Sequence, residues 1–181
     1  MAEHRIHASI WLRLEPAPEG HLRAVIKRLA DRHGTHDFLP HLTVCGSTLD
    51  VTALPEASLY ACQSDRLPLR VRATGIASAV GNPFQAVFIE IANSSELLRF
   101  REDMRRITRA DRLSAPHVSL FYAVGRRHTA ITFEARDLEE IARACRAEVG
   151  TSGYVLERPA IAYPGAGGQW LRVPEWRVED L

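Results

Sequence analysis

Pro40-His41-Leu42-Thr43-Val44 and Pro116-His117-Val118-Ser119-Leu120 are the two stretches that decide the fold, because both follow one order of residue types: Pro, His, apolar, hydroxyl, apolar. Each run of apolar and polar residues in alternation predicts a short strand introduced by proline. Side chains alternate across a strand, so the imidazole and the hydroxyl of each stretch share one face and the apolar residues share the other. Each stretch therefore offers two polar groups from a support anchored in a core.

The segments that precede the two stretches also correspond to each other. Residues 6–14 alternate as a strand that Pro16 and Pro18 end, and the apolar spacing in residues 22–30 predicts a helix that stops near Gly34. In the second cycle, residues 69–79 and 84–92 predict a hairpin around Gly81-Asn82-Pro83. Asn93 and Glu96 form a capping pattern before a helix whose apolar stripe is Leu97, Phe100, Met104 and Ile107.

This internal repeat predicts two related lobes. His7 to His41 spans 34 positions and Gln85 to His117 spans 32, so the cycles agree in length as well as order. We expect an α+β fold that is bilobal, with two pseudo-symmetric lobes, each a mainly antiparallel sheet flanked by helices, and an active-site cleft between them. Residues 1–181 form a single domain, with residues 1–66 and 126–181 in the first lobe and 67–125 in the second. The alternative is a coincidence between two common strand-helix-strand units.

The remaining segments carry weaker patterns. Residues 47–66 are predicted to be mainly loop, and Asp137 is a candidate cap for a third helix that ends at Gly150. Residues 154–163 and 169–178 predict a closing hairpin. Trp170 and Trp176 would then share one face as core residues without chemistry.

Composition limits the function classes. Of 181 residues, 46% are hydrophobic and 25% charged, and Lys plus Arg number 23 against 22 Asp plus Glu, so a long polyanion is a poor first candidate for a partner. The apolar runs are shorter than the roughly 18 residues of a membrane span, and no signal peptide is visible. We therefore expect a cytoplasmic monomer with no membrane contact. Cys45, Cys62 and Cys145 have no metal or disulfide spacing, and His33 and His36 stand without further ligands, so no metal is expected.

The four polar residues suit the opening of a cyclic phosphodiester. A neutral imidazole can take a proton from water as it attacks phosphorus, and an imidazolium can protonate the oxygen that leaves on the opposite side. We expect His41 and His117 to fill these two catalytic roles, with neither assigned to acid or base. Thr43 and Ser119 would donate hydrogen bonds to the non-bridging oxygens.

The paired motifs resemble those of the two-histidine (2H) phosphoesterases. Together with Ser9-Ile10-Trp11 and the Phe121-Tyr122 that follows the second motif, they look closest to the cyclic phosphodiesterases of the plant and yeast type. The resemblance implies catalysis without metal or other cofactor, and hydrolysis of nucleoside 2',3'-cyclic phosphates or ADP-ribose 1'',2''-cyclic phosphate to the 2'- or 1''-monophosphate. It also implies that Trp11 and Tyr122 border the substrate. Tyr122, five residues after His117, reaches the histidine face only if the strand ends or bulges first.

Two other functions stay open. A 2',3'-cyclic phosphodiesterase of the RNA ligase-like branch would act on RNA ends, and the near-zero net charge counts modestly against the basic cleft it should need. A nucleotide-binding module without turnover belongs to another class. Binding alone does not require two paired proton-transfer groups, so the two complete motifs disfavour it.

Overall fold

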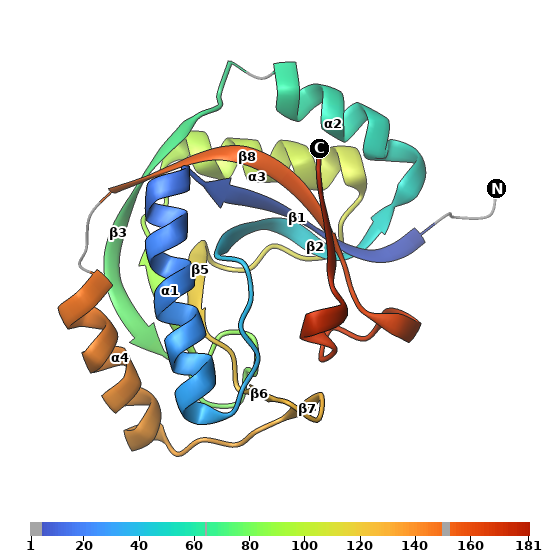
Figure 1. The fold of residues 1–181 in the computed structure, drawn as a ribbon. Helices are drawn as coiled ribbons and strands as arrows, with labels where there is room; N and C mark the ends of the chain where they lie inside the picture. The colour runs from blue at the N-terminus through green and yellow to red at the C-terminus, as the bar shows by residue number, and fades with distance from the viewer. Residues whose placement is uncertain (1–4, 64, 150–152) are drawn as a thin grey trace.

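The computed structural model describes residues 5–63, 65–149 and 153–181 (Figure 1). In this part of the chain, the strands and helices follow the order β1 (Arg5–Leu14), α1 (Pro16–His33), β2 (His41–Asp50), α2 (Leu54–Gln63), β3 (Leu69–Ser78), β4 (Val87–Ile91), α3 (Ser95–Thr108), β5 (His117–Phe121), β6 (Val124–Gly125), β7 (Thr129–Ala130), α4 (Ala135–Val149), β8 (Gly153–Tyr163) and β9 (Arg177–Asp180). The α+β class predicted from the sequence is confirmed.

One antiparallel sheet joins the two halves of the chain. Its strand order is β1-β2-β5-β4-β3-β8-β9, and β8 also pairs with β1, so the hydrogen-bonded strands close into a ring. Strands β2 and β5 meet at one residue pair, Leu42 and Val118, the central residues of the two motifs. The seam between the motifs therefore has the local two-fold character of an antiparallel pair. The predicted division into lobes at residues 66–67 and 125–126 stays a prediction.

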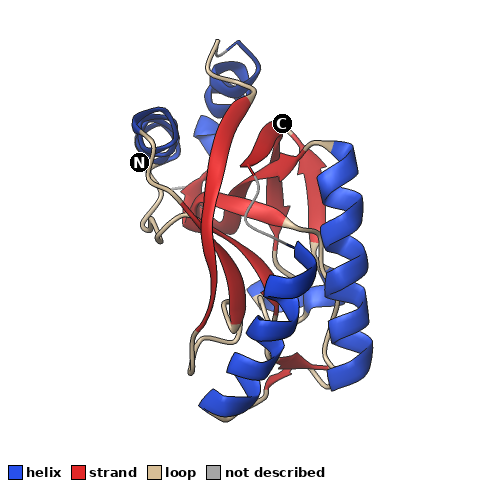
Figure 2. Ribbon diagram, turned by 90° about the vertical axis from the view of Figure 1, so that its left-hand side faces the viewer, coloured by secondary structure: helices blue, strands red, loops and turns tan. Residues whose placement is uncertain are grey.

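The helices cover the strands from two sides. Figures 1 and 2 show α1 and α4 on one side and α2 and α3 on the opposite side. The main core lies between these layers, and a second, smaller cluster contains Ile26, Phe38, Tyr122, Val124 and Val173. Phe84, Leu171 and Trp176 pack against this second cluster, which forms part of the support of the candidate site.

Helix boundaries follow local chemistry with small departures from prediction. Strand β1 ends at Leu14, before Pro16 as predicted, and Pro16 is the first residue of α1, because proline fits the first helical position, where no N–H donor is needed. Gly34 ends this helix at φ 66°, as predicted. Ser94, not Asn93, caps α3 by accepting the Leu97 N–H at 3.2 Å. Asp137 lies inside the first turn of α4, while Gly150 is outside the described residues.

The prediction that residues 47–66 are mainly loop is wrong. Strand β2 continues past Gly46, because the missing side chain lets this backbone approach Ser9: a Cβ there would lie 2.6 Å from the Ser9 Oγ. Helix α2 then spans Leu54–Gln63 and buries Ala57 and Ala61. Two small apolar residues give a helix too little contrast for its periodicity to be visible in the sequence.

The predicted closing hairpin is only partly correct. Strand β8 forms and pairs with β9, but residues 169–176 are not a strand, and a 3₁₀ turn occupies Val173–Glu175. Pro174 cannot donate to a strand ladder, which favours the turn. The expectation that Trp170 and Trp176 share a strand face is therefore wrong.

None of the helices in the described ranges combines the length and the apolar character needed to cross a membrane.

Candidate active site

The register of β2 and β5 brings the four predicted polar residues together. Leu42 faces Val118 in an antiparallel pair. Continuing this register by one residue each way sets His41 opposite Ser119 and Thr43 opposite His117, all on one face of the sheet. The two histidines therefore occupy diagonal corners of a block of four side chains.

The opposite face of both strands is anchored in the core. Leu42, Val44, Val118 and Leu120 all have 0% exposure. This agrees with the alternation predicted from the two motifs. Because core packing fixes these apolar side chains, it also fixes the direction in which the neighbouring imidazoles and hydroxyls point.

Both imidazoles are held by the same kind of backbone hydrogen bond. Nδ1 of His41 lies 2.7 Å from the Leu39 carbonyl oxygen, and Nδ1 of His117 lies 2.8 Å from the Ala115 carbonyl oxygen. A carbonyl oxygen only accepts, so Nδ1 carries a proton in each ring and Nε2 is the nitrogen free to exchange one. In both motifs a proline separates the carbonyl from the histidine and restricts the preceding residue to extended backbone.

His41 lies in an apolar environment formed largely by Trp11. The two rings stack at 3.5 Å between centroids with an interplanar angle of 7°, and His41 and Trp11 are 6% and 2% exposed. Burial is the main cause that lowers the pKa of His41 to about 3, and the nearby His117 and Arg13 lower it further, whereas the bond to Leu39 opposes the shift. His41 is therefore neutral near pH 7 and can accept a proton at Nε2.

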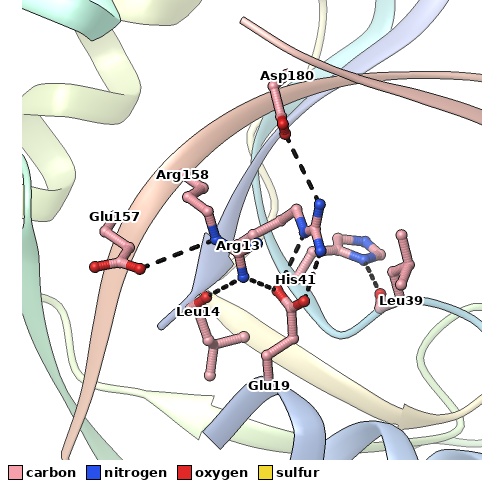
Figure 3. Close-up of polar contacts among 8 residues, drawn as sticks. All are labelled: Arg13, Leu14, Glu19, Leu39, His41, Glu157, Arg158 and Asp180. Atoms are coloured by element: carbon pink, nitrogen blue, oxygen red, sulfur yellow. Dashed lines mark hydrogen bonds and ion pairs between the residues drawn. The ribbon is translucent and has the colours of Figure 1, made fainter. Parts of the chain in front are cut away.

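Arg13 beside His41 belongs to an ion-pair network that joins three elements (Figure 3). Glu19 of α1 accepts hydrogen bonds from Nε and Nη2 of Arg13 on β1 at 3.1 and 2.5 Å. It also accepts one at 2.7 Å from Arg158 on β8, which donates a second bond to the Leu14 carbonyl oxygen. Glu19 thus holds two cations at the edge of the site.

His117 is less deeply placed than His41. Burial lowers its pKa below the ordinary value, Arg101 adds to the effect and the bond to Ala115 opposes it. Its ring contacts Phe88 edge-on at 5.5 Å between centroids. His117 is close enough to His41 to influence that residue's pKa, yet neither His117 nor Ser119 lines the pocket that contains His41.

Ser119 and Tyr122 form a small polar group inside the second core cluster. The Ser119 hydroxyl donates to the Phe84 carbonyl oxygen at 2.9 Å, and its side chain also hydrogen-bonds with Tyr122. Tyr122 reaches this face because β5 ends at Phe121. Burial raises the pKa of its phenol, and one face of its ring stacks on Phe38 at 3.5 Å.

An open pocket of about 540 Å³ adjoins His41. The predicted site residues Trp11, His41, Thr43 and Tyr122 line it, and so do residues that were not predicted: Ser9, Gly46, Ser47, Phe84, Arg112, Leu113, Ser114, Trp170 and Trp176. All three tryptophans of the chain therefore meet in one pocket. The available signal in the sequence was a pair of tryptophans that follows the glycine-rich turn at residues 164–168.

The loop that carries Trp170 and Trp176 is internally braced. Glu175 accepts the Ala166 N–H at 2.9 Å and a bond from Arg172 at 2.8 Å, while the Trp176 indole N–H donates to the Trp170 carbonyl oxygen at 2.9 Å. Trp176 also contacts Trp11, Phe84 and Tyr122. These contacts place half-buried aromatic side chains on the wall facing the pocket.

No group of three or more His, Cys, Asp or Glu side chains among the described residues is arranged to hold a metal ion.

Comparison with known proteins identifies the fold. No protein-family model and no curated protein sequence matches the chain. Among solved structures, E. coli LigT in complex with 3'-AMP matches with a TM-score of 0.58 at 12% identity, covering 98% of this chain and 95% of LigT. The complex of LigT with NADP+ gives 0.58 at 14% identity with the same coverage. A structure described as a phosphoesterase gives 0.57 at 12% identity, covering 97% and 95%. The chain therefore has the fold of LigT.

Proposed function

We propose that the protein is a metal-independent cyclic phosphodiesterase. It opens nucleoside 2',3'-cyclic phosphates or ADP-ribose 1'',2''-cyclic phosphate and leaves a 2'- or 1''-monophosphate. The observation that carries this proposal is the matched pair of imidazoles, each with Nδ1 bound to a backbone carbonyl oxygen and Nε2 free. Two proton-exchanging nitrogens from neighbouring strands suit a reaction that removes one proton and delivers another.

His41 is assigned as the base. It is the more deeply buried imidazole, and its pKa of about 3 keeps Nε2 unprotonated. It takes a proton from water as the water oxygen bonds to phosphorus. The imidazolium formed in this step lies against the face of Trp11, where a cation is stabilised by the ring.

His117 is assigned as the acid. As the P–O bond to the 3' oxygen breaks, its Nε2–H protonates that oxygen, and the phosphate remains on the 2' oxygen. In the ADP-ribose substrate, the bond to the 2'' oxygen breaks and phosphate remains at 1''. Binding of an anionic substrate raises the pKa of a nearby imidazole, which opposes the lowering by burial. The proton gained by His41 and the proton lost by His117 are exchanged back through solvent.

The hydroxyls and aromatic residues position the substrate in this proposal. Thr43, which lines the pocket, donates to a non-bridging oxygen, and Ser119 does so after its hydroxyl turns from the Phe84 carbonyl. Trp11 and Tyr122 border the substrate as the floor of the pocket, since both are almost fully buried. The half-buried Trp170 and Trp176 supply the faces on which a nucleobase stacks. The LigT complexes with 3'-AMP and NADP+ are consistent with a nucleotide ligand for this fold.

Hydrolysis assays in excess EDTA test the proposal. The substrates are 2',3'-cyclic AMP, ADP-ribose 1'',2''-cyclic phosphate and an RNA that ends in a cyclic phosphate. We expect turnover of a small cyclic phosphate, with His41→Ala and His117→Ala each at least about a hundredfold slower. His21→Ala, an exposed histidine of α1, is the matched control and keeps full activity.

Each other outcome has a defined meaning. Loss of activity on chelation contradicts the metal-free mechanism. Turnover confined to the RNA assigns the protein to the RNA-end alternative. Nucleotide binding without turnover of any of the three substrates replaces the enzyme with a binding module.

A further inference from the structure

The pocket beside His41 has two chemically different sides. One side is the aromatic wall that Phe84, Tyr122, Trp170 and Trp176 form. The other, here called the polar rim, consists of Ser9, Ser47, Arg112 and Ser114. A cyclic phosphate and a nucleobase use the histidines and the aromatic wall, and no step of the proposed mechanism uses the polar rim.

Arg112 supplies the cation of the polar rim. Nearby arginines are engaged: Arg109 pairs with Asp50 at 3.0 Å, and Arg101 donates to the carbonyl oxygens of Val44 and Ser114. Among the described residues, the exposed Arg112 guanidinium has no hydrogen-bond or ion-pair partner. A guanidinium with its donors free suits the oxygens of a phosphate, and the Ser47 and Ser114 hydroxyls lie on the same rim, whereas the Ser9 hydroxyl already donates to the Cys45 carbonyl oxygen at 3.2 Å.

The backbone of the polar rim is held in place before any ligand binds. Arg101, 2% exposed, donates to the Ser114 carbonyl oxygen at 2.6 Å from behind, and the Gly46 N–H donates to the Arg112 carbonyl oxygen at 3.3 Å. Ser47 beside this bridge has a φ of 85°, a conformation that costs free energy in a residue other than glycine. Backbone strain of this kind concentrates at ligand sites.

We infer that the polar rim binds a second phosphate of the substrate, with Arg112 as the specificity-determining residue. This inference rests on the proposed function and narrows its substrate class. Preferred substrates carry a phosphate on the 5' side of the nucleoside in addition to the cyclic one. A 5'-monophosphate, the diphosphate of an ADP-ribose derivative and the preceding phosphodiester of an RNA end all offer this chemistry.

Paired substrates test the inference. The kcat/KM for 2',3'-cyclic AMP is compared with that for the same compound carrying a 5'-phosphate, in the parent protein, in Arg112→Met and in Arg127→Met. Arg127 is an exposed arginine of the β6–β7 turn outside the pocket and serves as the control. We expect the parent protein and Arg127→Met to favour the phosphorylated substrate by at least about tenfold, as for a charged hydrogen bond. Arg112→Met should lose this preference, because its kcat/KM falls more on the phosphorylated substrate than on the plain one.

Three results would overturn the inference: equal rates for both substrates in the parent protein, a preference that persists in Arg112→Met, or an equal loss on both substrates in that variant. ADP-ribose 1'',2''-cyclic phosphate and the dinucleotide ApA 2',3'-cyclic phosphate distinguish the sources of the second phosphate. The substrate whose kcat/KM falls more in Arg112→Met carries the second phosphate that the polar rim prefers.

A binding measurement separates this inference from the proposed catalysis. Because every tryptophan lines the pocket, intrinsic fluorescence reports the binding of adenosine 2'-monophosphate and adenosine 2',5'-bisphosphate. The parent protein should bind the bisphosphate at least about tenfold more tightly than the monophosphate. Arg112→Met should bind the two ligands with equal affinity. This difference is expected even if no substrate is hydrolysed, in which case only the proposed function fails. Equal affinities in the parent protein contradict the second-phosphate subsite.

Discussion

Replacing Glu19 by Gln tests the ion-pair network that supports the His41 side of the site. The Glu19 side chain is 11% exposed, and its two partners Arg13 and Arg158 are 17% and 34% exposed. Gln keeps the shape of the side chain but removes the charge that neutralises both guanidinium groups. The variant therefore leaves two cations close together at a largely buried position.

The size of the effect follows from this burial. Removing one partner of a fully buried pair costs about 3–5 kcal/mol. Water reaches part of Arg158, and Asp180 lies 3.8 Å from Arg13, so the loss is smaller here. We expect the free energy of unfolding to fall by about 2–3 kcal/mol, which lowers the melting temperature by about 4–12 °C in a chain of this length.

Urea and thermal unfolding measure this change, with Asp31→Asn as the control. Asp31 pairs with Lys27 at 2.9 Å, but both side chains are more than half exposed, so the control should leave the unfolding midpoint unchanged. The same Glu19→Gln variant should hydrolyse cyclic phosphates more slowly, because an unneutralised Arg13 opposes the formation of a cation at His41. A stability loss below about 0.5 kcal/mol, the size of a surface substitution, would refute the assignment of Glu19 as the centre of this network.

Three further predictions follow from the protonation and hydrogen bonding of the site. The kcat/KM should fall about tenfold per pH unit above the pKa of His117, and burial lowers this pKa below 6.5. A maximum of kcat/KM in the alkaline range would contradict the assignment of His117 as the acid. The unfolded chain binds a proton at His41 below about pH 6.5, whereas the folded chain does so only near pH 3. Between these two pH values the free energy of unfolding therefore falls by about 1.4 kcal/mol for each unit by which the pH decreases. Urea unfolding of His41→Gln should show a correspondingly shallower dependence on pH. Ser119→Ala removes a donor to the Phe84 carbonyl oxygen and should lower the free energy of unfolding by about 1–2 kcal/mol, whereas an unchanged urea midpoint would show that this bond contributes nothing.

The two motifs were predictable because their chemistry and their anchoring lie in consecutive residues. Alternation alone sets His41 with Thr43 and His117 with Ser119, and burial of Leu42 and Val118 follows from the same period. The position of Tyr122 needed the end of β5, which periodicity locates only within a few residues.

The aromatic wall and the polar rim were not predictable, because distant segments build them. Trp176 lies near Trp11 only because Glu175 braces its loop on Ala166 and the loop packs on the second core cluster. Arg112 reaches the pocket through a bridge to Gly46, a contact between segments far apart in the chain. The Glu19 network likewise joins three elements whose charges show no local pattern.

A crystal structure with a nucleoside vanadate tests the central claim most directly, since its five-coordinate vanadium imitates an in-line displacement at phosphorus. We predict that Nε2 of His41 and Nε2 of His117 lie within about 3 Å of the two opposite apical oxygens, with both Nδ1 atoms still bound to the carbonyl oxygens of Leu39 and Ala115. A complex in which one imidazole stays out of reach of the vanadate, or both contact the same apical oxygen, would contradict the account.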